Sequence, residues 1–331
     1  MPCLVVATDP HHTDFSGELE ELAPIGAELR IEKCQTEDDV VERCRDADAL
    51  LVTYAPIGRR AIASLQRCRI IVRTGVGYDC VDVPAATARG IMVCNVPDYC
   101  VSEVAEHALA LILAWWRRIG ELDAQVRQQG WGLPCRPVHR LEGETLGLLG
   151  LGRIGQAVAL RARGFGLRLV VHDPFLSAEA VRAVAAEPVS LERLLSESDI
   201  VSLHAPLLDT TRGMMCRRTF RQMKPTALLV NTSRGGLVVI DDLVGAIREG
   251  WIAGAALDVV EKEPLPGDHP LRALPRVLLT PHAGWYSEEA EPELRRRSAR
   301  LVVQALRGER PASLLNPEAL TDPHGQRRAP G

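Results

Sequence analysis

Apolar runs alternate with amphipathic stretches along the first hundred residues. Four runs are apolar almost throughout and have the length of a strand: residues 4–7, 48–53, 69–72 and 91–94. Between them, residues 37–44 and 83–89 have helical character. Apolar strands separated by helices are typical of a parallel sheet covered on both faces. The pattern therefore predicts an α/β unit over this part of the chain.

A second alternating series begins at Thr145 and follows a break at Pro97. Between them we expect one long helix that Ser102 caps and that ends near Arg118, as a crossover between two domains. The strands predicted in this series are residues 146–149, 167–172, 200–203, 227–231, 255–259 and 277–280. Helices are predicted over residues 154–164 and 288–307, and the tail from about Pro317 is expected to fray.

Composition and charge narrow the class of protein. The chain has 331 residues, which favours two domains, and its net charge of −4 comes without any basic run. Nucleic-acid binding is therefore not expected. The N-terminus lacks a signal-peptide pattern, and the most apolar predicted helix, residues 105–116, contains His107 and is too short to cross a bilayer. We expect a cytoplasmic protein that does not bind membranes.

The nine cysteines form no C-x-x-C pair. Their odd number and scattered positions fit reduced thiols better than a disulfide framework or a zinc site. No metal is expected.

A glycine-rich segment follows the first strand of the second series. Gly150, Gly152 and Gly155 match G-x-G-x-x-G between a predicted strand and a predicted helix. In dinucleotide-binding folds such glycines allow close approach of a pyrophosphate to the helix N-terminus. Asp173 ends the next predicted strand, where a carboxylate would bind ribose hydroxyls and disfavour the 2′-phosphate of NADP. The segment predicts an NAD site; the alternative is a glycine turn that only packs a helix against a strand.

Three candidate catalytic residues follow three predicted strands of the second series. They are Arg234, Glu263 and His282. In parallel sheets, ligands bind beyond the carboxyl ends of the strands. Oxidation of an alcohol, or reduction of the ketone, needs a proton acceptor and donor such as histidine, a carboxylate to orient it, and an arginine to bind a carboxylate. The structural alternatives are a turn arginine, a solvated loop glutamate and a turn histidine.

These segments resemble the D-isomer-specific 2-hydroxyacid dehydrogenase family from about residue 50 to 315. The motifs that carry the resemblance are RTGVGYDCVDV, NVPDYCVSEVAEHAL, TLGLLGLGRIGQAVALRA, VNTSRGGLV, GAALDVVEKEP and TPHAGW. Within the family, the sequence looks closest to the C-terminal-binding-protein-like branch, because Arg73 precedes a glycine turn and Trp285 follows His282 by three residues. Cys80 departs from the family pattern, which has Asn there.

The resemblance implies an NAD(H)-dependent oxidoreductase that interconverts a D-2-hydroxy acid and its 2-oxo acid. His282 would be the acid/base and Glu263 its partner, with Glu261 as a rival, and Arg234 would bind the substrate carboxylate and keto oxygen. Further substrate contacts are expected from Arg73, Val76, Gly77 and Trp285. The expected cofactor contacts are Gly150, Gly152, Arg153, Ile154, Gly155, Asp173, Ala205, Pro206, Thr211, Thr232, Ser233 and Asp258.

The resemblance also implies two Rossmann-like parallel-sheet domains, with the cofactor domain inserted into a discontinuous substrate domain. Residues 1–100 with 293–320 would form the substrate domain, 101–292 the NAD-binding domain, and 321–331 a disordered tail. A homodimer through the cofactor domain is expected.

Two other functions stay open at this stage. The first is a corepressor-like protein that senses NAD(H), since the branch includes such proteins. The second is a biosynthetic dehydrogenase of a substituted 2-oxo acid, for instance a phosphonate, because Arg73, Arg136 and Arg140 would suit a second anion. Residues 131–140 match no motif of the family, and we expect them near the active site and the subunit interface.

Overall fold

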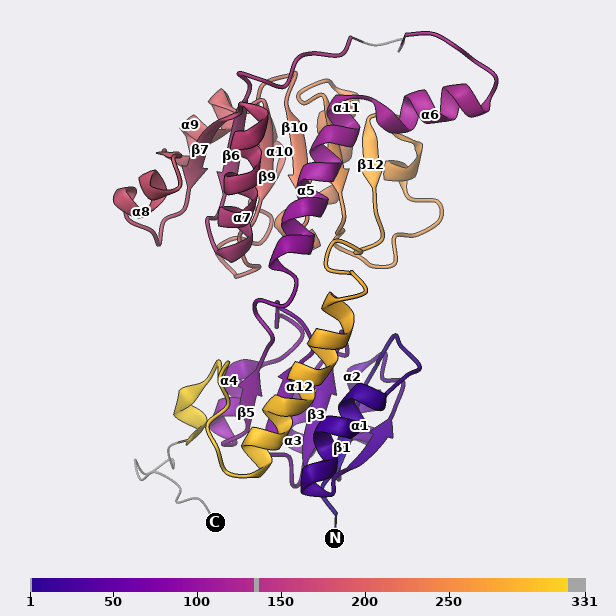
Figure 1. Ribbon diagram of the computed structural model, residues 1–331, viewed down its shortest axis with the longest axis vertical. Helices are drawn as coiled ribbons and strands as arrows, with labels where there is room; N and C mark the ends of the chain where they lie inside the picture. Colours follow the sequence, from indigo (N-terminus) through magenta and orange to yellow (C-terminus); the bar gives the residue numbers. More distant parts are fainter. Residues whose placement is uncertain (1, 134–136, 321–331) are drawn as a thin grey trace. The chain divides into compact units, whose positions relative to one another are not determined.

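The computed structural model describes residues 2–133 and 137–320 (Figure 1). The predicted disordered tail, 321–331, and Arg136 lie outside the described residues. The chain divides into two compact units, Met1–Tyr99 with Ser287–Gly331, and Cys100–Tyr286. The first unit is therefore discontinuous in sequence, and the second is inserted into it.

Five parallel strands form the sheet of the first unit, in the order β2–β1–β3–β4–β5. Their bounds are β1 (Leu4–Ala7), β2 (Glu28–Ile31), β3 (Ala49–Val52), β4 (Ile70–Arg73) and β5 (Met92–Cys94). Four of them were predicted from apolar runs. β2 was missed because it is an edge strand, in which Ile31 is 47% exposed and Glu28 faces solvent.

Helices cover both faces of this sheet. On one face, α1 (Ser16–Leu22) packs against α12 (Ala290–Leu306), which also contacts β4. The other face is covered by α2 (Glu37–Arg43), α3 (Arg59–Ser64) and α4 (Val83–Ala88), whose apolar side chains form one core with those of the strands. After α12, the chain attaches to β5 through the buried Asn316, whose Oδ1 accepts a hydrogen bond from the Val93 amide at 2.7 Å.

Seven parallel strands form the sheet of the second unit, in the order β12–β11–β10–β9–β6–β7–β8. Their bounds are β6 (Thr145–Leu149), β7 (Arg168–His172), β8 (Glu187–Pro188), β9 (Ile200–Leu203), β10 (Leu228–Asn231), β11 (Gly254–Leu257) and β12 (Val277–Leu279). The chain runs outward from β6 to β8 and then returns to build the other half from β9 to β12. The strand order therefore reverses between β6 and β9, where open α/β sheets bind ligands.

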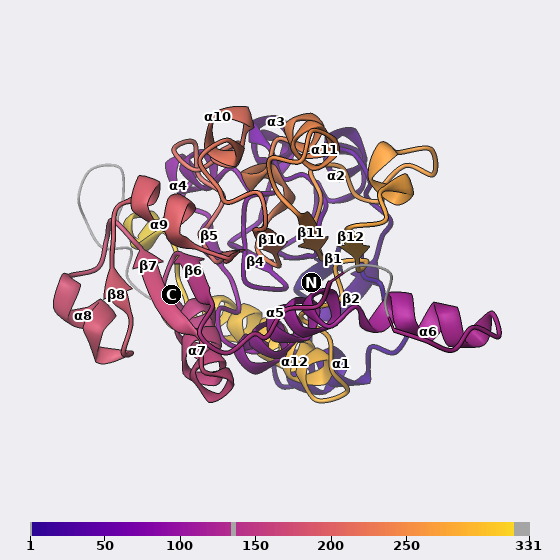
Figure 2. The same ribbon diagram turned by 90° about the horizontal axis from the view of Figure 1, so that it is seen from above.

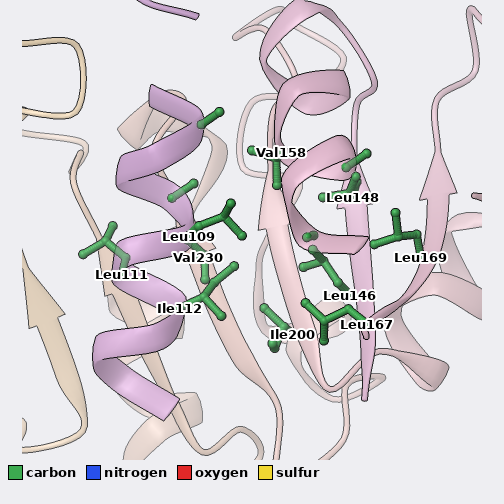
Figure 3. Packing of buried hydrophobic residues seen from close by; sticks show 14 of the residues in the cluster. Leu109, Leu111, Ile112, Leu146, Leu148, Val158, Leu167, Leu169, Ile200 and Val230 are labelled. Carbon is green, nitrogen blue, oxygen red and sulfur yellow. The ribbon is translucent and has the colours of Figure 1, made fainter. Parts of the chain in front are cut away.

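Alternate residues of these strands enter two separate cores. On one face, α5 (Val101–Trp116) and α7 (Arg153–Ala162) pack side chains such as Ile112 and Val158 against Leu146 and Leu148 of β6 (Figure 3). Leu149, the next residue of β6, enters the core on the other face. That face is covered by α9 (Leu191–Glu197), α10 (Arg217–Phe220) and α11 (Ile240–Arg248).

The helices of the structure differ from the sequence-based expectation in more than one place, since the predicted cap is wrong and several helices were not predicted. The prediction that Ser102 caps the long helix is wrong: Cys100 precedes its first residue, and no side chain caps it. The Ser102 hydroxyl instead accepts a hydrogen bond from Arg161 on α7. In addition, α6 (Ile119–Arg127) was not predicted, and it extends outward from its unit in both views (Figure 2). No helix among the described residues is long and apolar enough to cross a membrane.

Candidate active site

The segments singled out from the second half of the sequence lie at one edge of the seven-stranded sheet. In the register of the sheet, Leu149, Leu203, Asn231, Leu257 and Leu279 stand side by side at the ends of their strands. The glycine-rich segment and the segments around Arg234, Asp258 and His282 leave the sheet from these ends. Parallel pairing therefore brings together residues that are more than 130 positions apart.

The glycine-rich segment forms a tight turn between β6 and α7. Gly150 has φ = 93°, a conformation that favours glycine. A Cβ at Gly155 would lie 2.5 Å from the Gly150 carbonyl oxygen, whereas a Cβ at Gly152 would meet nothing within 4 Å. Gly155 therefore serves the packing of the turn, and Gly152 leaves open space. Arg153 and Ile154 begin α7, whose N-terminal amide groups can bind an anion.

Asp173 lies directly beyond β7 and is fixed to the same turn. Its Oδ2 accepts a hydrogen bond from the Leu151 amide at 2.9 Å, and its Oδ1 accepts one from the Phe175 amide at 3.0 Å. The carboxylate is thus held directly against the glycine turn. This is the position at which a carboxylate can bind the ribose of a dinucleotide.

The loops after β9 and β10 form another part of this edge. The Ser233 hydroxyl donates to the carbonyl oxygen of Ala205 at 2.7 Å, and the Thr211 hydroxyl donates to that of Pro206 at 2.6 Å. Thr232 is 8% exposed, and its Oγ1 is buried without a hydrogen-bond partner among the described residues. A buried hydroxyl in this state is satisfied when a ligand bonds to it. The Thr232 hydroxyl and the open space at Gly152 therefore both fit a bound dinucleotide cofactor.

Arg234 follows a turn that Asn231 organises. The Asn231 side chain donates to the Arg234 carbonyl oxygen at 2.9 Å and accepts from the Ser233 amide at 3.0 Å. A Cβ at the next residue, Gly235, would lie 2.0 Å from the backbone of Val260. This glycine therefore lets the Arg234 turn approach the loop that begins at Asp258.

Asp258 holds the turn that carries His282. Its carbonyl oxygen accepts from the His282 amide at 2.8 Å, and its carboxylate accepts from the amides of Ala283 and Gly284, each at 2.9 Å. His282 has φ = 55°, which is uncommon for a residue with a side chain. Three hydrogen bonds to a single residue stabilise this conformation.

The Asp258 carboxyl is ionised in this environment. Burial opposes ionisation, but hydrogen bonds from His107, Thr280 and the amides of Gly284 and Ala283 lower the pKa of Asp258 to about 2. The Thr280 hydroxyl donates to it at 2.6 Å. His107 and Thr280 were not among the predicted site residues, although both stand in motifs that carry the family resemblance, NVPDYCVSEVAEHAL and TPHAGW.

Glu263 and His282 are in direct contact. Glu263 Oε2 lies 2.7 Å from His282 Nδ1, and Glu263 Oε1 accepts from the Val260 amide at 2.9 Å. The carboxylate therefore links the loop after β11 to the histidine. Glu261, its rival in the sequence, is exposed at the turn of that loop. Trp285 lies three residues after His282, with its ring edge-on to Tyr286 at 5.7 Å between centroids.

The remaining predicted residues, Arg73, Val76 and Gly77, belong to the first unit. Arg73 ends β4 and is 7% exposed; its guanidinium lies over the Tyr54 ring and donates to the Thr74 carbonyl oxygen. The Nε of Arg73 is buried without a partner among the described residues. Val76 accepts from the Asn95 amide group through its carbonyl oxygen at 2.6 Å. Gly77 is the next residue of the loop after β4.

Comparison with known proteins identifies the family. The model described as "D-isomer specific 2-hydroxyacid dehydrogenase, NAD binding domain" matches residues 109–284. The chain belongs to this family. It is 43% identical to a glyoxylate reductase of Korarchaeum cryptofilum over 286 residues, which cover 85% of this chain and 86% of that protein. The predicted family and the predicted fold class, two parallel-sheet α/β units, are both confirmed.

Two solved structures have the same fold. One is a D-lactate dehydrogenase from Aquifex aeolicus with NAD and lactic acid (TM-score 0.85, 26% identity, 94% of this chain and 99% of that chain). The other is an NADPH-dependent glyoxylate/hydroxypyruvate reductase from Sinorhizobium meliloti with NADP and malonate (TM-score 0.87, 28% identity, 99% of this chain and 100% of that chain).

The family dehydrogenase reaction is therefore assigned to this chain: it interconverts 2-hydroxy and 2-oxo acids with a nicotinamide dinucleotide. This favours an enzyme over the corepressor-like alternative, while the assignment to a branch stays a prediction.

Proposed function

We propose that the protein reduces small 2-oxo acids, glyoxylate among them, with NADH. The observation that carries the proposal is the 2.7 Å contact between Glu263 and His282 at the sheet edge that also carries the glycine turn. The glyoxylate reductase names of relatives support a small substrate. The bound nicotinamide supplies the hydride that reduces the carbonyl carbon.

The residues of this chain transfer the proton and bind the substrate. Glu263 accepts a hydrogen bond from Nδ1–H of His282, so that Nε2 is the nitrogen that gives a proton to the substrate oxygen. The Arg234 fork binds the substrate carboxylate and polarises the keto oxygen. Trp285 bounds the pocket for the substrate side chain. The first unit carries Arg73, Val76 and Gly77, and we propose it as the substrate domain.

The choice of NAD over NADP rests on the charge of Asp173. A carboxylate at this position accepts hydrogen bonds from two ribose hydroxyls and repels a 2′-phosphate. The second unit, Cys100–Tyr286, is the corresponding cofactor domain.

The test is an NADH-oxidation screen over 2-oxo acids of different size and charge. Glyoxylate, hydroxypyruvate and pyruvate are expected to be reduced faster than branched or aromatic acids. Phosphonate-bearing acids belong in the panel because the buried Arg73 would suit a second anion.

The variant H282Q tests the acid/base. It is expected to lower kcat by at least about 10³-fold with little change in the Kd of NADH. Full turnover in H282Q would overturn the assignment of the acid/base.

We also propose a homodimer through the cofactor domain. Four apolar side chains on and just after α6 are strongly exposed: Ile119 (55%), Val126 (51%), Trp131 (92%) and Leu133 (90%). Several exposed apolar side chains within one short segment of the chain favour an interaction surface there. Light scattering should give twice the mass of one chain, and I119E combined with V126E should give a monomer. A monomeric wild-type protein at micromolar concentration would contradict this proposal.

A further inference from the structure

His107 contacts two residues of the candidate site from a helix that carries none of the predicted site residues. It lies on α5, and its Nε2 is 2.9 Å from Thr280 Oγ1 and 3.3 Å from Asp258 Oδ1. Asp258 and Thr280 lie after β11 and β12, more than 150 residues further along the chain. His107 thus links α5 to this edge of the sheet through polar contacts.

The hydrogen-bond donors and acceptors define the state of the His107 ring. The Thr280 hydroxyl gives its hydrogen to Asp258 Oδ1 at 2.6 Å, so its oxygen can only accept from His107. The Asp258 carboxylate can also only accept. Nε2 of His107 therefore carries a hydrogen and points it toward both oxygens.

The ring also supports the turn after His282 by direct packing. A Cβ at Gly284 would lie 3.2 Å from His107 Cδ2 and 2.9 Å from Asp258 Oδ2. The backbone of the turn therefore lies against His107 and the carboxylate together. The same carboxylate accepts from the amides of Ala283 and Gly284, which keep His282 in its left-handed conformation.

We propose that His107 is a positioning residue for His282. Its Nε2–H holds Thr280 and the Asp258 carboxylate in place, and Asp258 in turn holds the turn that aims the catalytic ring. The proposal rests on the proposed function, in which His282 transfers the proton. The side chain of His107 is 24% exposed, so the contact is not deep in the core, and its loss should affect the turn more than the fold.

The test compares H107Q with H107L in the full-length protein. Glutamine places an amide N–H close to the position of Nε2, whereas leucine fills a similar volume without a donor. H107L is expected to lower kcat on the order of 10–100-fold with the KM for NADH within about threefold, because small misplacements of a catalytic group cost rate. H107Q should recover most of that loss. E106Q, one residue away on the same helix, removes only the charge of an exposed ion pair with Arg161 and serves as the control.

Hydrogen exchange gives a readout that needs no substrate. The amides of Ala283 and Gly284 should exchange at least about 10-fold faster in H107L and in T280V, and at the wild-type rate in H107Q and E106Q. The double variant H107L/T280V should lose no more kcat than the more affected single variant, because both substitutions act through Asp258.

Several results would overturn the proposal. One is equal activity of H107L and H107Q. Another is that the amides of Ala283 and Gly284 exchange at the wild-type rate in H107L and T280V. A third is that these amides exchange faster in H107L while kcat is unchanged. If H107L does not fold, H107Q and T280V still provide the comparison. A wild-type protein that reduces no 2-oxo acid would overturn the proposed function instead, while the exchange rates would still decide whether His107 holds the turn.

Discussion

Glu263 and His282 are joined by a 2.7 Å contact between Oε2 and Nδ1, and the other carboxylate oxygen of Glu263 accepts from the Val260 amide. In E263Q, the amide oxygen can still accept from Val260, but the NH₂ group then faces Nδ1. His282 would have to accept there and carry its hydrogen on Nε2, the wrong tautomer for accepting a proton from the alcohol. We expect kcat/KM for hydroxy-acid oxidation to fall on the order of 10²-fold.

The matched control is E261Q, which removes the exposed carboxylate two residues earlier. Steady-state kinetics in the oxidation direction should place E261Q within about twofold of wild type, as for most surface changes. A larger loss in E261Q than in E263Q would reverse the assignment of the partner.

The ionised Asp258 should make stability depend on pH. The pKa of this carboxyl is about 2 in the fold against an ordinary 3.8, so as pH falls the unfolded chain takes up the proton first. The stabilisation is complete above pH 4 and is lost as pH falls through 2. At about 1.4 kcal/mol per pKa unit, it amounts to about 2 kcal/mol.

D258N should therefore unfold more readily than wild type at pH 7, by about 2 kcal/mol or more. The difference should shrink between pH 4 and pH 2. Urea titrations of both proteins without cofactor would measure it. A difference that stays constant over this range would show that the charge of Asp258 contributes nothing to stability.

Gly152 and Gly155 should respond differently to substitution by alanine. The Cβ of G152A meets no protein atom within 4 Å, and its φ of −67° suits alanine, so stability without cofactor should change by less than about 0.5 kcal/mol. The added methyl group fills space that the pyrophosphate needs, so the Kd of NADH should rise at least about 10-fold.

The variant G155A places a Cβ 2.5 Å from the Gly150 carbonyl oxygen. It should lose about 1–3 kcal/mol of stability as well as affinity for the cofactor. Thermal melts and NADH fluorescence titrations separate the two effects; equal stability of both variants would contradict this account.

Asp173 should control the choice of cofactor. D173N keeps an oxygen to accept from the Leu151 amide and removes the charge that repels a 2′-phosphate. The ratio of kcat/KM for NADPH to that for NADH should rise at least about 10-fold. E187Q, which removes a carboxylate paired with Arg168 on β7, should leave the ratio unchanged. An unaltered ratio in D173N would contradict the proposed role of Asp173.

Most of the fold could be predicted because local pattern and tertiary structure agree. The buried strands of both units have apolar runs, because helices cover both faces of the sheet and the side chains on both faces are therefore apolar. β2 lacked this signal because it lies at an edge. α6 could not be predicted because its apolar residues are exposed, so no core-facing stripe distinguishes it.

The sequence by itself determined the alternation of strands and helices, the glycine turn with Asp173 beyond the next strand, and the placement of Arg234, Asp258 and His282 just after strands. These are local properties, set by residue type and short spacing. Only the tertiary structure decided that Glu263 contacts His282, that three hydrogen bonds to Asp258 hold the His282 turn, and that His107 supports it from α5. Such contacts join residues distant in sequence, and they depend on the strand order and on the space left between packed backbones, which no local pattern encodes.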